Sequence, residues 1–224
     1  MEEDYKARLP ATLQEGLHHF FDDLTAKRVK EQKKLVNNLR GEKYNGILAD
    51  WDTYLHAEAA EPEDEPEYNI QPIKMTAGKV TLKRFKRVLR DGRAIDQDSP
   101  DEDLHRLRIQ GKKLRYSLEF FRSLYPDKEM KALIAQLKLL QNNLGLFNDL
   151  SVQQDMLQEY QNGLKPGTIK AQKTGAAIGG LLTNLYHEQQ EVRKEFEETF
   201  SRFDSKDNVE LYHSLFSSKE KKNK

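Results

Sequence analysis

The stretch LHRLRIQGKKLRYSLEFF, residues 104–121, decides the fold of this chain. Every third or fourth position in it belongs to one seam, which is the period of an amphipathic α-helix. The seam consists of Leu104, Leu107, Gly111, Leu114, Leu118 and Phe121. A neighbouring stripe with the same spacing is basic, and we call its members, His105, Arg108, Lys112 and Arg115, the 105–115 row. The pattern predicts a helix over about 101–125, with Arg106 and Lys113 pointing away from that row.

A second basic stripe lies in the segment just before. Residues 79–93 hold seven basic residues and one acidic residue. Five of them recur at helical spacing beside Leu82, Phe85 and Leu89. These five, Lys79, Lys83, Lys86, Arg90 and Arg93, form the 79–93 row. Like charges three or four residues apart repel each other by a few tenths of a kcal/mol, so a helix selected only for stability would alternate their signs.

Two rows of one sign on adjacent antiparallel helices predict a groove of high positive potential. Successive phosphates or an acidic strand would neutralise such a groove, with Arg donating forked hydrogen bonds and Lys acting as a mobile charge. The alternative is that both rows are solvated surfaces, whose acidic partners lie on the later segments 128–162 or 168–203.

The rest of the chain has the same helical period, and no segment alternates with period two. Further helices are expected over 10–40, 43–57, 74–95, 128–162, 168–203 and 207–216. Ser99 is a candidate N-cap for the helix that begins near 101, with Pro100 at its first position. The fold class is therefore all-α: an antiparallel helical bundle, with one four-helix bundle over about 74–203 and a partial first half.

Four regions are expected along the chain. Residues 1–57 form the partial first helical half, and 58–72 form a linker, because that segment has six acidic residues, three prolines and no basic residue. Residues 73–216 form the bundle, and 217–224 form a basic tail.

Composition excludes several classes of function. The 224 residues include 37 basic and 37 acidic ones, so the net charge is zero and the chain as a whole has no general attraction for nucleic acid or membrane. There is no cysteine, which excludes disulfides, thiolate nucleophiles and Cys-based metal sites. No signal-peptide core and no apolar run of membrane-spanning length is present. We therefore expect a cytoplasmic protein.

The segment 104–121 resembles the signature helix of the CHAD family, the conserved histidine α-helical domain. The likeness lies in a histidine, an arginine three residues on, and a Lys-Leu-Arg-Tyr run. LLQNNLGLFNDLSVQQDML, residues 139–157, resembles that family's Leu-Gly-x-x-Asn-Asp-Leu segment. The resemblance covers about 10–203. It implies two four-helix bundles around a basic channel and binding of inorganic polyphosphate without chemistry of the domain's own.

The chain departs from the family pattern in one respect. A full CHAD domain has two signature-type helices, whereas only 104–121 is of this type here, so the opening helices of the first half are missing. A partial half leaves an apolar face open, which a second copy commonly covers. We therefore expect a homo-oligomer, most simply a dimer. The polyphosphate link also suggests an association with polyphosphate granules.

The expected polyphosphate-binding residues are the two rows together with Arg28. They are Lys79, Lys83, Lys86, Arg90, Arg93, His105, Arg108, Lys112, Arg115 and Arg28. Arg28 lies on an apolar stripe and either faces the channel or extends its head to solvent. No enzyme activity, metal or cofactor is expected, because His105 has at most one carboxylate close in sequence. The alternative function is a helical scaffold that binds an acidic protein partner.

Overall fold

A computed structural model of the chain describes residues 2–57 and 72–217. Within these residues the regular elements are all helices and no strand occurs, which confirms the all-α prediction. The predicted linker at 58–72 and tail at 217–224 lie almost wholly outside the described residues. None of the helices described is long and apolar enough to cross a membrane.

The chain divides into two compact units. Unit 1 combines Met1–Pro66 with Leu157–Asn184, and unit 2 combines Glu67–Met156 with Leu185–Lys224. The expected division kept 73–216 together as one bundle, whereas the contacts group 157–184 with the N-terminal segment instead. The two longest helices, α7 (Asp127–Asn162) and α8 (Ile169–Phe203), therefore each contribute residues to both units.

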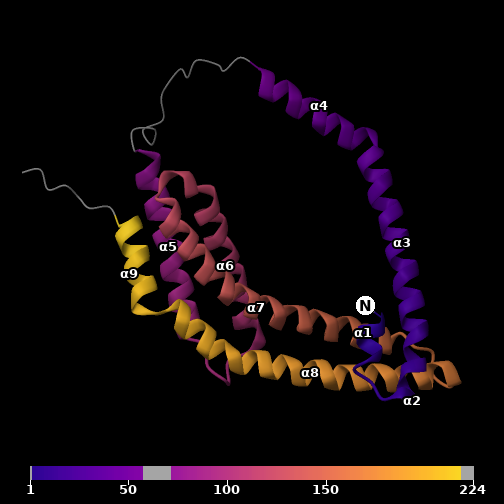
Figure 1. The fold of residues 1–224 in the computed structure, drawn as a ribbon. Coiled ribbons are helices and arrows are strands. Elements are labelled where there is room, and N and C mark those ends of the chain that lie inside the picture. The colour runs from indigo at the N-terminus through magenta and orange to yellow at the C-terminus, as the bar shows by residue number, and fades with distance from the viewer. Residues whose placement is uncertain (1, 58–71, 218–224) are drawn as a thin grey trace, which may run out of the picture. The chain divides into compact units, whose positions relative to one another are not determined.

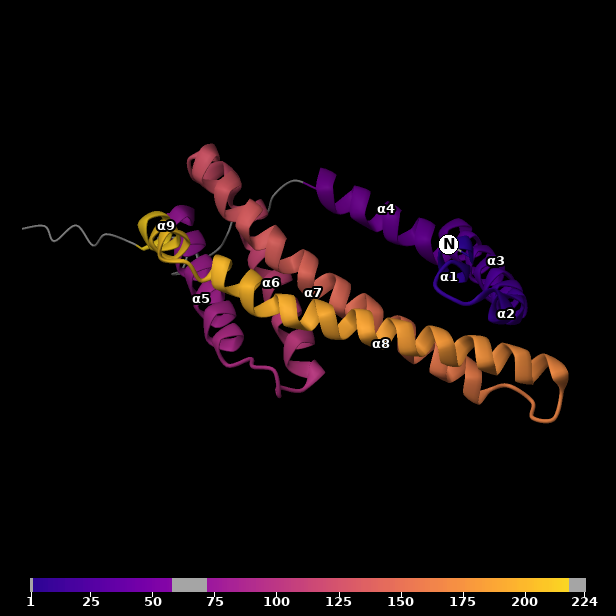
Figure 2. The ribbon, with the colours of Figure 1, turned by 60° about the horizontal axis from the view of Figure 1, so that its bottom comes forward.

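Unit 2 contains most of the buried core. Its other helices are α5 (Ile73–Arg93), α6 (Asp101–Phe120) and α9 (Lys206–Phe216), and α5 lies between α9 and α6 in both ribbon views (Figures 1 and 2). Phe85 of α5 stacks on Tyr212 of α9 with ring centroids 3.7 Å apart, and Phe203 of α8 lies 5.8 Å from Phe85. All three side chains are buried. The seam predicted from 104–121 is buried as well, at Leu104, Leu107, Gly111, Leu114 and Leu118.

The two ends of α6 differ from the sequence prediction. The helix ends at Phe120, and residues Arg122–Leu124 form the short 3-10 helix η3 instead of a last α-helical turn. At its start, Pro100 is the N-cap, and no side chain of the described residues caps the helix. The Ser99 hydroxyl donates a hydrogen bond to Asp96 Oδ1 at 2.8 Å and accepts one from the Asp96 amide, so it closes the preceding turn instead.

Unit 1 begins with α1 (Glu2–Lys6), which the sequence did not predict, and α2 (Ala11–Gln14). The 3-10 helix η1 (Glu15–Leu17), α3 (His18–Arg40) and α4 (Glu42–His56) follow. The expected helix over 10–40 is therefore broken near Gly16. Gly16 packs against α8 so closely that a Cβ there would lie 2.3 Å from the Lys173 carbonyl oxygen. A tightened turn at η1 accompanies this approach.

The core of unit 1 lies at the base of α3. Phe20 meets the ring of Tyr160 at 4.9 Å between centroids, and the Tyr160 hydroxyl donates to Asp23 Oδ2 at 2.6 Å. Leu17, Phe20 and Phe21 are buried there, but no residue of α3 after Phe21 and none of α4 is buried. We call residues 24–56, which run from this base to the end of α4, the α3–α4 arm.

Candidate functional site

The 105–115 row lies along α6, directly beside the buried seam. Because the row repeats every three or four residues, its side chains leave the helix on one flank. Arg108, Lys112 and Arg115 are half-buried and His105 is exposed. From His105 to Arg115 the helix rises roughly 15 Å at about 1.5 Å per residue.

The row is turned toward α7. His105 Nδ1 lies 2.6 Å from Asn148 Oδ1, and Arg115 Nη1 donates to Gln141 Oε1 at 3.4 Å. With the asparagine oxygen as acceptor, Nδ1 carries the proton, which leaves Nε2 of His105 available to another partner. Asn148 of α7 thus orients the ring of His105 at the start of the row.

Two cations in the middle of the row are unpaired. Within the described residues, Arg108 and Lys112 have no hydrogen-bond or ion-pair partner. Arg115 is different, since its Nε lies 3.3 Å from Glu119 Oε1. The row therefore carries uncompensated positive charge over its central turn, flanked by a histidine at one end and a partly neutralised arginine at the other.

The 79–93 row leaves α5 on the opposite side from the buried face. All five of its residues are exposed, whereas Thr81, Phe85, Val88 and Gly92 are buried. Arg93 forms two hydrogen bonds with the Asp204 carboxylate, both at 2.7 Å, just before α9. Arg90 pairs with Asp91 of its own helix. Arg93 thus ties the end of α5 to the turn between α8 and α9.

The side of α5 that meets α6 is occupied by Arg84 instead. Its Nη1 donates to the Lys113 carbonyl oxygen at 2.6 Å and to Ser117 Oγ at 2.7 Å. On a helical wheel, Lys113 and Ser117 lie on the flank of α6 opposite to Arg108 and Arg115. The expected groove lined jointly by the two rows is therefore not formed: α6 turns one flank to α5 and the other, with the 105–115 row, to α7.

A family model described as the CHAD domain matches residues 1–158. This chain belongs to the CHAD family. The match covers α1 to most of α7, including the signature helix α6, and ends before α8, although the sequence resemblance was expected to reach about 203. No curated protein matches the chain.

The CHAD chain also contains basic residues that the sequence prediction passed over. Arg84 and Arg87 were counted among the seven bases of 79–93 but assigned to no surface. Arg84 is half-buried against α6, and Arg87 is exposed without a partner in the described part of the chain. Their spacing of three residues, offset from the 79–93 row, could have indicated from the sequence that they lie on a different side of α5. Arg84 places positive charge where α5 meets α6, next to the Lys113 carbonyl oxygen.

Arg28 lies in α3 and belongs to unit 1. It is exposed, and no ion pair holds it within the described residues. Exposure fits both alternatives, so a role for Arg28 in polyphosphate binding stays a prediction.

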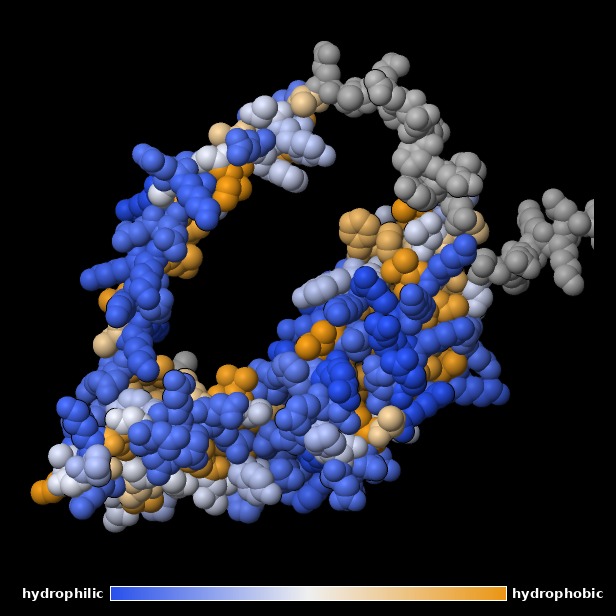
Figure 3. All heavy atoms as spheres, turned by 180° about the vertical axis from the view of Figure 1, so that it is seen from behind, coloured by the Kyte–Doolittle hydropathy of each residue, from blue (hydrophilic) through white to orange (hydrophobic). Residues whose placement is uncertain are grey.

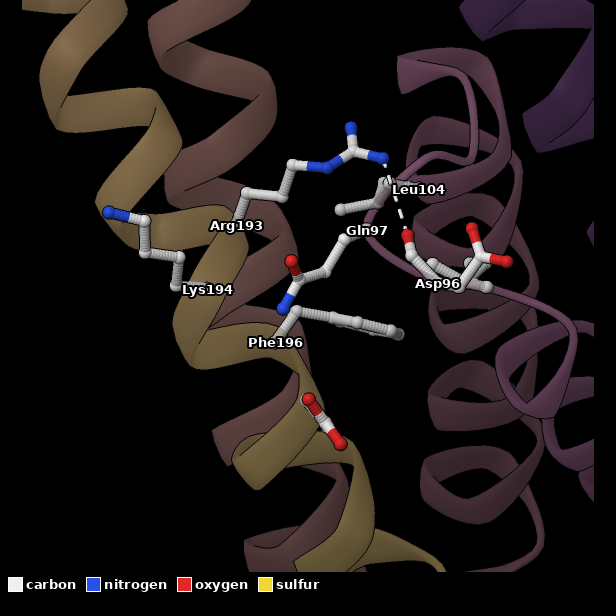
Figure 4. Close-up of a pocket in the computed structure, with 8 residues that line it drawn as sticks. Asp96, Gln97, Leu104, Arg193, Lys194 and Phe196 are labelled. Carbon is white, nitrogen blue, oxygen red and sulfur yellow. Dashed lines mark hydrogen bonds between the residues drawn. The ribbon is translucent and has the colours of Figure 1, made fainter.

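A small hollow of about 190 Å³ lies where α8 crosses the loop before α6 (Figure 4). Arg193 fills one side of it and donates to Asp101 Oδ1 at 2.7 Å, to the Asp96 carbonyl at 3.4 Å, and to the Ser99 carbonyl. The Ser99 hydrogen bond keeps the pKa of the Asp96 carboxyl below its ordinary value. Because its guanidinium already donates to these oxygens, Arg193 holds the loop in place and has few donors left for an anion.

The described residues contain no candidate metal-binding site. No group of three or more His, Asp or Glu side chains there is placed to hold a metal ion. His18 Nδ1 lies 3.0 Å from Glu2 Oε1, which is an ion-pair contact. The expectation of a metal-free chain stays a prediction.

Proposed function

We propose that this CHAD chain binds inorganic polyphosphate, or a similar linear polyanion, along the 105–115 row, and that it carries out no chemistry on it. The observation that carries the proposal is the unpaired step from Arg108 to Lys112. Two neighbouring cations without a counter-charge repel each other, and an anion that contacts both removes that cost. The association of the family with polyphosphate supports the choice of anion.

The row suits an extended anion better than a compact one. Its charges are spread over roughly 15 Å of one helix, so one small phosphate cannot reach all of them. An arginine at position 108 or 115 can donate two parallel hydrogen bonds to phosphate oxygens, while Lys112 supplies a point charge. His105, oriented by Asn148, can donate or accept a further hydrogen bond through Nε2.

The 79–93 row takes a secondary role in this proposal. It is exposed, and Arg93 and Arg90 already have carboxylate partners. Lys83 and Lys86, which lack partners in the described residues, would raise the local potential and attract the anion from a distance. Contributions of this kind are screened within a Debye length of about 10 Å at 0.1 M salt.

The sharpest test compares neighbouring lysines. Lys112→Ala and Lys113→Ala remove the same charge from the same helix, but only Lys112 belongs to the row. We expect Lys112→Ala and Arg108→Ala to weaken binding of long-chain polyphosphate about 5- to 30-fold, which corresponds to about 1–2 kcal/mol for a lost charge-assisted hydrogen bond. Lys113→Ala should change it less than about 2-fold. Titration calorimetry at fixed salt measures these values.

Circular dichroism and melting temperature should be recorded for each variant, since basic side chains also pack against the seam. Equal losses for the three variants, with folding intact, would favour a diffuse charged surface and the alternative function as a scaffold for an acidic protein. Affinity should also fall steeply with salt as counterions are released. Long-chain polyphosphate should compete far better than pyrophosphate. Phosphate release on incubation with divalent metal would contradict the non-catalytic part.

A further inference from the structure

The α3–α4 arm exposes a concentration of large apolar side chains. Ten of the twenty large apolar residues that are exposed in the described chain fall within positions 29–55. They are Val29, Leu35, Val36, Leu39, Tyr44, Ile47, Leu48, Trp51, Tyr54 and Leu55. Figure 3 shows orange, hydrophobic residues at intervals along both helices of the arm, among blue and pale ones. Isolated apolar residues are common on protein surfaces, but a run of this density is not.

These side chains form continuous stripes, not a scatter. In α4, the spacing from Tyr44 to Leu48, Trp51 and Leu55 is four, three and four residues, which keeps them on one face. Ile47 and Tyr54 widen the same stripe. In α3, Leu35 and Leu39 repeat with a spacing of four, and Val29 and Val36 lie on the adjoining side.

The exposed area is large enough for a stable contact. The individual exposed fractions run from 36% for Val36 to 71% for Tyr54. Together they correspond to an area on the order of 1,000 Å² per chain, compared with roughly 800 Å² per partner in a standard protein interface. Trp51 and Tyr54, whose rings stack at 5.6 Å, are of the residue types that are enriched at the centres of interfaces.

The charges on the two helices indicate what covers the arm. α3 carries six Lys or Arg against three Asp or Glu, whereas α4 carries one lysine against three acidic residues. On a helical wheel Lys33 borders the apolar face of α3, and Asp50 borders that of α4. A two-fold symmetric contact must be self-complementary. If α3 of one copy packs against α4 of the other, the two-fold axis places α4 of the first copy against α3 of the second. The contact is then self-complementary, with two equivalent α3–α4 pairs.

We infer that the α3–α4 arm is a dimerisation surface, in which α3 of one chain packs against α4 of a second copy. The apolar stripes form the centre of the contact, and the basic rim of α3 faces the acidic rim of α4. This inference does not depend on polyphosphate binding, since no residue of the 105–115 row takes part in it.

The first experiment measures the mass of the full chain in solution over a range of concentrations, by sedimentation. We expect a mass of two chains. Trp51→Glu, in the middle of the apolar stripe, should raise the dimer dissociation constant by about 30-fold or more, the size expected for an interface hot spot. Thr53→Glu introduces the same charge on the opposite face of α4 and should leave the constant within a few-fold of the original. Both positions are exposed, so helicity should be retained.

A second experiment tests the pairing of α3 with α4. One variant carries Lys33→Glu and Lys34→Glu, and another carries Asp50→Lys and Asp52→Lys. Each alone places like charges across the contact and should dimerise weakly, while an equimolar mixture should recover dimers that contain one chain of each kind. A monomeric original chain, or equal behaviour of Trp51→Glu and Thr53→Glu, would overturn the inference. A mixture that stays monomeric would overturn the proposed pairing.

Discussion

Phe85 in α5 and Trp51 in α4 occupy equivalent places in the sequence pattern, since each is the largest side chain of an apolar stripe with helical spacing. Phe85 is fully buried between Phe203 and Tyr212, whereas Trp51 is 59% exposed. In unit 2, side chains of α8 and α9 cover the apolar stripe of α5. The α3–α4 arm, beyond Phe21, has no such cover among the described residues of its own unit.

Periodicity predicts which face of a helix is apolar but not what covers that face. Both regions satisfy the same pattern rule. Burial depends on whether other helices are close enough to pack, and this is a property of the tertiary arrangement. When a helix has an exposed apolar stripe, covering that stripe by another molecule stabilises the complex. The gain is about 25 cal/mol for each Å² of apolar surface removed from water.

The largest effect should come from truncating the buried member of the pair. Phe85→Ala removes a ring with no exposed surface and is expected to lower the free energy of unfolding of unit 2 by about 3–5 kcal/mol. Trp51→Ala, studied at concentrations too low for self-association, should change it by less than about 1 kcal/mol. Denaturant titration followed by far-ultraviolet circular dichroism measures both. Similar losses for the two variants would mean that the arm is packed as tightly as unit 2.

A pair of glycines sharpens the contrast within unit 1. An added methyl group at Gly16 meets the Lys173 backbone oxygen at 2.3 Å, and backbone atoms cannot step aside cheaply. Gly16→Ala should therefore destabilise unit 1 by about 1–3 kcal/mol. At Gly46 in α4 no neighbouring atom of residues 2–57 or 72–217 lies within 4 Å of the corresponding position, so Gly46→Ala should stabilise the helix by about 0.5–1 kcal/mol. Thermal melting shifts of opposite sign are the expected readout, and a shift of the same sign would contradict this account.

The smallest effect concerns a hydroxyl group. Tyr212 is completely buried and its hydroxyl has no hydrogen-bond partner in the described part of the chain. Tyr212→Phe should therefore be neutral or stabilising by up to about 1 kcal/mol near neutral pH. Burial raises the pKa of Tyr212 above its ordinary value. The ionised form is thus favoured in the unfolded chain, and stability present below the ordinary tyrosine pKa is lost as pH rises beyond it.

The advantage of Tyr212→Phe over the original chain should therefore grow in alkaline solution. Tyr54→Phe, at a ring that is 71% exposed, serves as the control and should show no such growth. A constant difference between Tyr212→Phe and the original chain across the alkaline range would argue against burial of the hydroxyl.

The sequence predicted the helices well where the pattern is local. The expected helix over 207–216 is α9 at Lys206–Phe216, and that over 43–57 is α4 at Glu42–His56. It failed at Gly16, because the break there depends on contact with α8, about 160 residues later in the chain. It also missed the short α1.

The candidate site was predicted only in part, for a similar reason. The members of the 105–115 row follow from spacing alone, and they do share a flank of α6. Whether that flank meets α5 or α7 depends on how the helices pack, and on the contacts of Arg84 and Asn148 in particular. Spacing holds no information about this choice, so the joint groove was wrongly predicted. The part that the 105–115 row plays in binding stays a prediction.

Trp51 has a consequence for spectroscopy. It is the single tryptophan of the chain, and it lies on the open stripe of α4 beside the ring of Tyr54. Intrinsic fluorescence excited in the red edge of the absorption band therefore reports on the α3–α4 arm alone. Melting of the buried aromatic cluster of unit 2 would leave that signal nearly unchanged, whereas covering of the arm by another molecule would shift the emission to shorter wavelengths. A single cuvette experiment can thus follow the arm separately from the rest of the protein.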